Sequence, residues 1–309
     1  MTGVKLKHVA AENEEIISAG SYTARAGQTV HLNDQITASR AGTRSYTPDD
    51  MARLVGSVRH GIGQGRPTSP TTLEVTGESS TQAARRLFEE NAGPTALLNF
   101  ASARNPGGGY LRGARAQEED LCRVSALYTT LLEAPDYYAA HRASSDLLYS
   151  NRVIYSPDVP VFRNEHYALL DRPYPVSFLT CAAPNAGEFA RHHPEQAATA
   201  PEAMADLLAN VLVERAAGVL AVAAHHGQRV LILGAWGCGV FRNDPAQVAA
   251  AFGTHLSAGG LFENAFTRIV FAVLDNSPTR QKYTAFHNAF APDPGTLPPH
   301  DRSKWSIHT

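Results

Sequence analysis

The sequence has few cysteines, almost no net charge and no long apolar run. Its 309 residues include only Cys122, Cys181 and Cys238, an odd number in which no two are spaced Cys-x-x-Cys. We therefore expect no disulfide framework and a reducing, cytoplasmic environment. No apolar run approaches the ~18–20 residues of a membrane span, and no apolar segment typical of a signal peptide follows Met1 to His8. These absences predict a soluble protein without a membrane partner.

The charge balance argues against one large class of binding proteins. The formal net charge is −2 and the sequence pI is about 6.7. Proteins that coat DNA or RNA rely on many contacts between basic side chains and phosphates, so we expect no direct DNA binding. A pocket that takes one end of an anionic polymer is compatible with this charge. With 43% hydrophobic residues, the chain can bury a large core in one domain with an extension or in two domains.

The N-terminal part of the chain differs in pattern from the rest. A helical pattern over residues 9–19 is followed by a turn-rich part with short extended pieces around Tyr22 and Val30. Pro48 can begin a second helix, which leads into the glycine-rich residues 60–67. That glycine-rich piece is the best candidate for a domain boundary.

Beyond this boundary, strands alternate with helices. The expected strands cover residues 73–75, 95–100, 153–155, 176–181, 230–233 and 269–274. The expected helices cover residues 79–88, 121–132, 136–148, 201–224, 246–256 and 279–290. This alternation predicts an α/β sandwich with a mixed, largely parallel central sheet. We divide the chain into a mostly helical accessory segment packed on the core (1–70), a main domain (71–291) and a tail (292–309).

The first glycine-rich loop runs from Asn105 to Gly109 and follows the strand that ends at Phe100. Three consecutive glycines let the backbone approach a ligand with no Cβ in the way, and the Asn105 amide can hydrogen-bond a ribose hydroxyl. Seven residues separate Gly109 from Gln117, which is followed by Glu118 and Glu119, and we expect a long helix to begin there. A loop that holds a sugar, followed by acid/base groups, is what glycosidic-bond cleavage needs. The alternative is a mobile connection.

The two adjacent carboxylates cannot play the same role. Neighbours on a helix point about 100° apart, so Glu118 and Glu119 cannot be the opposed pair of an ordinary glycosidase. We expect one to transfer the proton and the other to fix a hydroxyl or the loop. A helix N-terminus lowers a carboxylate pKa, so burial or a substrate phosphate must raise it in a general acid. The alternative is that both only favour the helix dipole, by about 0.3–1 kcal/mol each.

The second glycine-rich loop follows the strand that ends at Leu233 and precedes a helix. Free N–H groups in such a turn can bind an anion, here a diphosphate, with Phe241 against a ribose or base. The loop matches neither a Walker A motif nor the dinucleotide fingerprint. Asp244 can be the N-cap of the next helix, with Gln247 as its capping-box partner. Tight packing between strand and helix is the alternative reading of this loop.

Other candidates carry less weight. His192-His193 and His225-His226 are adjacent pairs whose side chains diverge, so we expect no metal site. Cys238 could be a nucleophile but is better explained as a small residue packed under the second loop. Trp236 could stack on a ligand or serve as a hydrophobic anchor.

Taken together, these motifs resemble the signature of poly(ADP-ribose) glycohydrolases, which have a macrodomain fold. The resemblance includes residues 99–106 before the glycines, residues 117–119, residues 155–162, residues 182–185 and residues 234–241. It extends over about residues 70–290 and is most similar to the compact bacterial-type members. It implies a three-layer α/β/α macrodomain over residues 71–291.

The resemblance also implies an activity and roles for residues. The enzyme would hydrolyse the ribose–ribose bonds of poly(ADP-ribose) from chain ends and release ADP-ribose, with no metal or redox cofactor. Glu119 resembles the catalytic acid/base and Glu118 its neighbour that holds ribose hydroxyls. Phe241 resembles the aromatic residue that orders the terminal ribose. The Glu78 region and Asp275-Asn276 are candidates for contacts with adenine. The implied substrate-binding residues are Asn105, Gly107, Gly108, Gly109, Gln117, Gly237, Cys238, Gly239, Val240, Phe241 and Asn276.

Two other functions share these motifs. One is a macrodomain that binds ADP-ribose without cleaving it, although such a reader has no need of two carboxylates. The other is a hydrolase of mono-ADP-ribosylated side chains or of O-acetyl-ADP-ribose. For the glycohydrolase we expect ADP-ribosylated proteins as partners, a monomeric state and a place in the DNA damage response.

Overall fold

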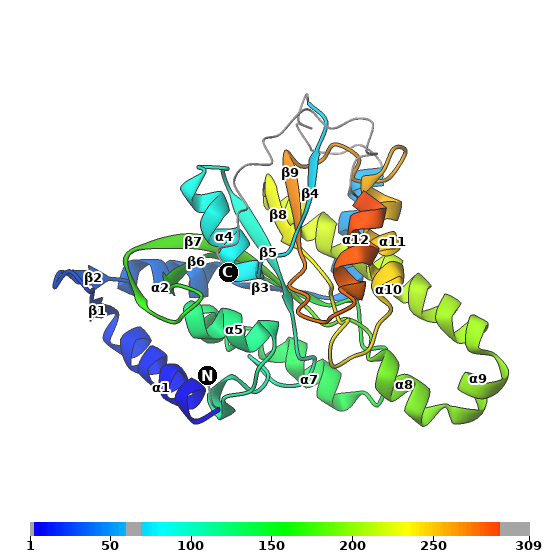
Figure 1. Cartoon of the computed structure of the whole chain (residues 1–309), viewed down its shortest axis with the longest axis horizontal. Helices are drawn as coiled ribbons and strands as arrows, with labels where there is room; N and C mark the ends of the chain where they lie inside the picture. The colour runs from blue at the N-terminus through cyan, green and yellow to red at the C-terminus, as the bar shows by residue number, and fades with distance from the viewer. Residues whose placement is uncertain (1–2, 60–68, 291–309) are drawn as a thin grey trace.

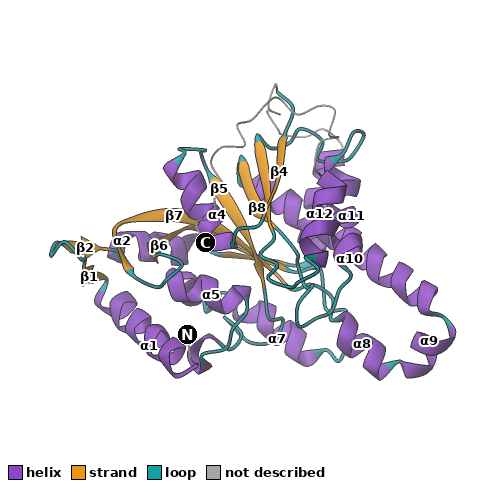
Figure 2. Cartoon of the chain, in the orientation of Figure 1, coloured by secondary structure: helices purple, strands orange, loops and turns teal. Residues whose placement is uncertain are grey.

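The computed structural model describes residues 3–59 and 69–290 and contains a seven-stranded sheet with helices on both faces (Figures 1 and 2). The strand order is β3-β6-β7-β5-β8-β9-β4. The strands are β3 (Arg44–Tyr46), β4 (Thr72–Thr76), β5 (Thr95–Phe100), β6 (Val153–Arg163), β7 (Leu169–Cys181), β8 (Val230–Leu233) and β9 (Arg268–Ala272). The β3–β6 and β6–β7 pairs are antiparallel and the other four are parallel. The predicted mixed, largely parallel sheet is confirmed.

Alternation of apolar side chains along the central strands builds two cores. In β8, Leu231 and Leu233 join one core while Val230 and Ile232 join the other. Successive side chains of a strand point to opposite faces, so a strand buried on both faces reads as a continuous apolar run. One core is covered by α3 (Pro48–Arg59), α10 (Pro201–His225), α11 (Pro245–Leu256) and α12 (Gln281–Phe290). The other is covered by α1 (Gly3–Ala19), α2 (Asn33–Gly42), α4 (Ser80–Glu89), α5 (Gln117–Val124), α6 (Leu127–Leu131) and α7 (Pro135–Ala143).

The N-terminal segment is tied into the sheet more closely than the sequence indicated. The predicted short extended pieces are β1 (Ser21–Thr23) and β2 (Thr29–His31), which form a separate two-stranded sheet. The prediction missed both α2 and β3, and β3 pairs with β6 as the edge strand of the large sheet. The proposed boundary at residues 60–67 and the tail 292–309 lie outside the described residues. The division into domains therefore stays a prediction.

The long helix expected after the two carboxylates is a wrong prediction, because the chain is interrupted at Ser125. That residue is fully buried and extended (φ −143°, ψ 176°), and it forms an isolated bridge with Val161 of β6. Its Oγ donates to the Leu121 carbonyl at 2.7 Å, which closes α5. Pairing with a neighbouring strand thus overrides a helical apolar pattern that continues into α6.

Two shorter helices and one long helix complete the fold. These are α8 (Ala186–His192) and α9 (Pro194–Thr199), which lead into α10. Of the described helices, α10 alone is long and apolar enough to cross a membrane by length and composition. However, 67% of its most apolar window is buried inside the protein, as in the core helix of a soluble fold.

Candidate active site

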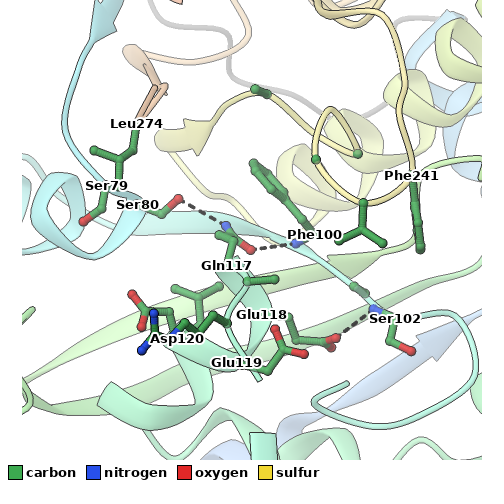
Figure 3. Close-up of a pocket in the computed structure, with 18 of the residues that line it drawn as sticks. Ser79, Ser80, Phe100, Ser102, Gln117, Glu118, Glu119, Asp120, Phe241 and Leu274 are labelled. Carbon is green, nitrogen blue, oxygen red and sulfur yellow. Dashed lines mark hydrogen bonds between the residues drawn. The ribbon is translucent and has the colours of Figure 1, made fainter. Parts of the chain in front are cut away.

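A cavity of about 900 Å³ opens at the carboxyl ends of the parallel strands. Parallel strands end at the same edge of a sheet, and ligands of α/β proteins bind there. Figure 3 shows Glu118, Glu119 and Gln117 on one side of this cavity and Phe241 on the other. The wall includes residues 79–81 after β4, 100–105 after β5, 115–121 and 123 around α5, 235, 237 and 239–241 after β8, and 272–274 from the end of β9.

Gln117 fixes where the carboxylate-bearing helix begins. Its Nε2 donates to the Leu98 carbonyl at 2.9 Å and to Ser80 Oγ at 3.1 Å. Its Oε1 accepts from the Phe100 N–H at 2.8 Å (Figure 3). The side-chain amide is thus bonded to the end of β5 and to α4. Gln117 lines the cavity, but its polar atoms hold the first turn of α5 in place.

Glu118 is buried and held by the protein through both carboxyl oxygens. Only 2% of the residue is exposed. Its Oε2 accepts from the Ser102 N–H at 2.7 Å and its Oε1 accepts from Asn99 Nδ2 at 3.2 Å. Desolvation raises the pKa of Glu118 to about 8, although these donors act in the opposite direction. Burial therefore outweighs these hydrogen bonds at Glu118.

Glu119 differs from its neighbour because one of its oxygens is left free. Its Oε1 accepts from the Gly109 N–H at 2.8 Å. Its Oε2 is buried and has no hydrogen-bond partner within residues 3–59 and 69–290. An unpaired buried oxygen costs about 1–3 kcal/mol unless a partner arrives. Glu119 lines the cavity, so a ligand can supply that partner.

The three glycines make room for other parts of the protein rather than for a ligand, and Gly108 makes room for the carboxylates. A Cβ on Gly108 would lie 2.5 Å from Glu119 Oε1 and 3.0 Å from Glu118 Oε2. Gly108 also has φ +57°, which favours glycine. A Cβ on Gly107 would meet the Tyr128 ring at 2.9 Å. None of Gly107, Gly108 and Gly109 lines the cavity, so the expected direct approach to a ligand is corrected.

The second loop is open to the cavity, as predicted. Gly237, Gly239, Val240 and Phe241 line it, and Val240 is 82% exposed. Phe241 contacts the Tyr149 ring at a centroid distance of 5.8 Å. This half of the site offers an exposed rim of backbone and apolar side chains to a ligand.

Beneath the second loop, the buried residues are structural. Cys238 does not line the cavity; its thiol lies against the Trp236 carbonyl, and burial raises its pKa to about 12. The nucleophile alternative is therefore disfavoured. Trp236 is fully buried and its Nε1 donates to the Cys181 carbonyl at 2.9 Å, so it is an anchor. Asn243 Nδ2 holds the loop through the Pro184 carbonyl at 2.8 Å.

The helix that follows this loop begins as expected, with one difference. Asp244 caps α11 by accepting from the Ala246 N–H at 2.7 Å. Gln247 does not complete a capping box, because its Nε2 instead donates to the Ala205 carbonyl of α10. A tertiary hydrogen bond to α10 therefore replaces the local capping bond that the sequence motif predicts for Gln247.

The predicted ribose and adenine contacts have different outcomes. Asn105 is exposed and lines the cavity, and its N–H donates to Ser102 Oγ at 3.2 Å. Asn276 is exposed and does not line the cavity, so its contact with adenine stays a prediction. Asp275 accepts from the Lys282 N–H and stabilises the start of α12. Glu78 is ion-paired with Arg86 at 2.6 Å.

Several cavity residues were not predicted. Some of them follow the carboxyl ends of β4 and β9, where ligands of α/β proteins bind, so the sequence could have indicated them. Others reach the cavity from segments far away in the sequence, and no local pattern indicates them. The missed residues include Leu6, Ser79, Ser80, Thr81, Ser102, Arg104, Arg115, Asp120, Arg123, Tyr149, Tyr167, Leu274 and Lys282. Within the described ranges, no group of three or more His, Cys, Asp or Glu side chains could hold a metal ion.

Comparison with known proteins identifies the family. The model of the microbial-type PARG catalytic domain matches residues 10–164. A poly(ADP-ribose) glycohydrolase structure from Thermomonospora curvata is 46% identical, with a TM-score of 0.84, over 93% of this chain and 99% of that chain. A complex of that protein with the inhibitor ADP-HPD is 45% identical, with a TM-score of 0.82 and the same coverage.

A second organism gives the same result. The Deinococcus radiodurans poly(ADP-ribose) glycohydrolase in complex with ADP-ribose is 47% identical, with a TM-score of 0.75, over 84% of this chain and 98% of that chain. A search of curated proteins found no match. The fold, the carboxylate pair and these similarities agree: the chain belongs to the microbial-type poly(ADP-ribose) glycohydrolases, hydrolases that cleave the glycosidic bonds of poly(ADP-ribose).

Proposed function

We propose that this glycohydrolase binds the terminal ADP-ribose unit of the polymer and uses Glu119 as its general acid and base. The observation that carries this role is that Glu119 lines the cavity while its buried Oε2 has no partner in the described parts of the chain. The homologous structures named above bind ADP-ribose or ADP-HPD. A cavity of about 900 Å³ is ample for a ligand of that size.

In this proposal the second loop holds the diphosphate and Phe241 contacts the terminal ribose. Backbone N–H groups in a turn before a helix favour an anion. The anomeric carbon then lies beside Glu119, and Glu118 fixes a ribose hydroxyl. The second loop and the carboxylates that the first loop positions would therefore contact opposite ends of one nucleotide sugar.

The chemistry follows in two proton transfers. The Glu119 carboxyl donates its proton to the departing 2′-oxygen as the C–O bond breaks and the anomeric carbon gains oxocarbenium character. The resulting carboxylate takes a proton from water as the water oxygen bonds to that carbon. The nearby diphosphate stabilises the cationic centre. The products are ADP-ribose and a polymer shortened by one unit.

The test compares wild-type protein with Glu119→Gln on labelled poly(ADP-ribose). Because this change keeps the shape and removes the titratable proton, we expect turnover to fall by ~10²–10⁴-fold while ADP-ribose still binds. Asp120→Asn is the matched control, a carboxyl-to-amide change at the adjacent cavity residue, and should retain turnover. Equal turnover by wild type and Glu119→Gln would remove Glu119 from this role.

We also propose action from chain ends. At early times on long polymer, an enzyme that removes terminal units releases ADP-ribose alone, whereas internal cleavage releases free oligomers. The same assay on a mono-ADP-ribosylated protein and on O-acetyl-ADP-ribose tests the related hydrolase activities. Activity on these substrates exceeding that on polymer would favour the second candidate function.

The cellular setting is also proposed. We infer a monomer in the cytoplasm that acts on ADP-ribosylated proteins in the DNA damage response. Support for a reducing compartment comes from Cys122, Cys181 and Cys238, which are all buried and unpaired with one another. Sedimentation of the purified protein and fractionation of cells test the state and the location.

A further inference from the structure

The N-terminal helix α1 is packed against the helix that carries the two carboxylates. Figure 1 shows α1 beside α5, and the two helices are in contact. Asn13 of α1 is completely buried at this contact. Its Nδ2 donates to the Arg123 carbonyl at 2.7 Å and to the Cys122 carbonyl at 3.2 Å. One side chain from α1 therefore binds two backbone groups of α5.

These two carbonyls belong to the last turn of α5, where a helix cannot satisfy its own acceptors. The preceding one, from Leu121, accepts from Ser125 Oγ within the same segment. The other two depend on a residue that is 109 and 110 positions earlier in the chain. Asn13 thus closes the C-terminal end of α5 while Gln117 fixes its beginning.

Asn13 is itself held in one orientation. Its Oδ1 accepts from Arg163 Nε of β6 at 2.6 Å, and Arg163 is only 4% exposed. Arg163 also donates to the Tyr167 carbonyl at 2.7 Å and pairs with Glu12 at 2.9 Å. The acceptor and both donor bonds of the Asn13 amide are therefore used, and the amide links α1, β6 and α5.

A second contact joins α1 to the first glycine-rich loop. Tyr110 Oη lies 3.2 Å from the Ala10 carbonyl and 3.0 Å from Glu14. Tyr110 directly follows Gly109, whose N–H binds Glu119. The same N-terminal helix thus supports both the helix that bears Glu119 and the loop that orients its carboxyl group.

We propose that Asn13 is a positioning residue for catalysis, which fixes α5 so that Glu118 and Glu119 face the cavity in their working geometry. This inference rests on the proposed role of Glu119. Because α5 has only eight residues, loss of its C-terminal bonds lets the whole helix tilt, including its first turn. A displacement of the reacting group by 1 Å can cost about 10²-fold in rate.

The test uses Asn13→Ala and Asn13→Asp, assayed well below the melting temperature of each variant. Asn13→Asp keeps the size and an acceptor for Arg163 but replaces the amide donor with an oxygen. We expect kcat on poly(ADP-ribose) to fall about 10–100-fold in both variants. The Kd for ADP-ribose should change by less than about threefold, because Asn13 does not line the cavity.

Ile16→Ala is the matched control in the same helix. Ile16 is 8% exposed and packs in the core without bonding α5, so its truncation destabilises α1 and should leave kcat intact. A second readout is the pH profile. If α5 tilts away from Ser102 and Asn99, Glu118 loses donors that lower its pKa, so the part of the pH–rate profile that Glu118 sets should move to higher pH in both Asn13 variants and not in Ile16→Ala.

The possible outcomes distinguish a failure of the inference about Asn13 from a failure of the proposed role of Glu119. If Asn13→Ala and Asn13→Asp keep wild-type kcat while Glu119→Gln is inactive, the inference about Asn13 is wrong and the role of Glu119 stands. If Ile16→Ala, matched in stability loss, lowers kcat as much as the Asn13 variants, the effect reflects stability and the inference also fails. If Glu119→Gln is fully active, the proposed function fails whatever the Asn13 variants do.

Discussion

The two glycine-rich loops look alike in the sequence but serve different physical purposes. In the first, the chain folds onto its own buried carboxyl groups, and Gly108 is needed because any Cβ would strike both of them. In the second, Gly237 is also crowded, by Asn243 and Ala183, but Gly239 has nothing within 4 Å of a Cβ and the neighbouring Val240 is 82% exposed. A glycine can thus mark a close approach within the protein or a surface left open for a ligand, and burial tells them apart.

The sharpest comparison is the same substitution in both loops. Gly108→Ala adds a methyl group at φ +57° against Glu118 and Glu119, so we expect kcat to fall by about 100-fold or more. Strain and repacking should also lower the free energy of unfolding by about 1–3 kcal/mol. Gly239→Ala should leave stability within about 0.5 kcal/mol of wild type. Steady-state kinetics measure kcat and denaturant unfolding measures the free energy of unfolding. Similar effects of Gly108→Ala and Gly239→Ala would contradict the distinction between a packed and an open glycine.

The buried Glu118 carboxyl beside the first glycine-rich loop predicts that the stability of the protein depends on pH. Glu118 has a pKa raised to about 8 in the folded state, above its value in the unfolded chain. Folding favours the protonated form of Glu118. Its contribution to the free energy of unfolding is therefore complete below the unfolded pKa of ~4.3 and is lost as the pH rises towards 8.

Glu118→Gln, which cannot ionise, should therefore gain stability relative to wild type as pH rises from 5 to 8. The gain is expected to be about 1–3 kcal/mol, and thermal unfolding of both proteins at several pH values measures it. As a control, Glu195→Gln in α9 changes an exposed carboxylate and should show no such trend. A constant difference between Glu118→Gln and wild type across this range would contradict the raised pKa.

Substitutions in the second glycine-rich loop should affect ligand binding more than the stability of the fold. Phe241→Ala removes an aromatic ring at the cavity wall, and we expect the Kd for ADP-ribose to rise by up to about tenfold. The melting temperature should stay close to wild type because the ring is only partly buried. Calorimetry and thermal unfolding give the two values, with Phe241→Leu as the control that keeps an apolar side chain. A large loss of stability with unchanged binding would reverse the assignment of this loop.

The sequence predicted the central strands well because they are buried on both faces. The expected strand at residues 230–233 coincides with β8, and that at residues 95–100 coincides with β5. Continuous apolar runs between turn residues leave little choice of structure. The same pattern cannot show where a helix is cut by a distant strand, so the break at Ser125 and the edge strand β3 were missed.

Sequence analysis identified those residues of the candidate site that belong to short, contiguous motifs. Glu118, Glu119, Asn105 and Phe241 line one cavity, as the spacing of the two loops indicated. Asn276 lies outside the cavity wall, because the end of a strand fixes the neighbourhood but not which side chain turns inward. The purpose of Gly108 was misjudged, since the contacts that it permits are made to Glu118 and Glu119, 10 and 11 positions away.

By itself, the sequence determined the strand-and-helix order, the two loops at the strand ends and the acidic pair, because these depend on periodicity and on local backbone freedom. Tertiary structure decided that burial raises the pKa of Glu118, that the Oε2 of Glu119 has no partner within the described residues, and that α1 supports α5 through Asn13. These properties depend on burial and on hydrogen bonds between segments far apart in the chain, where desolvation and geometry act only after the layers have packed.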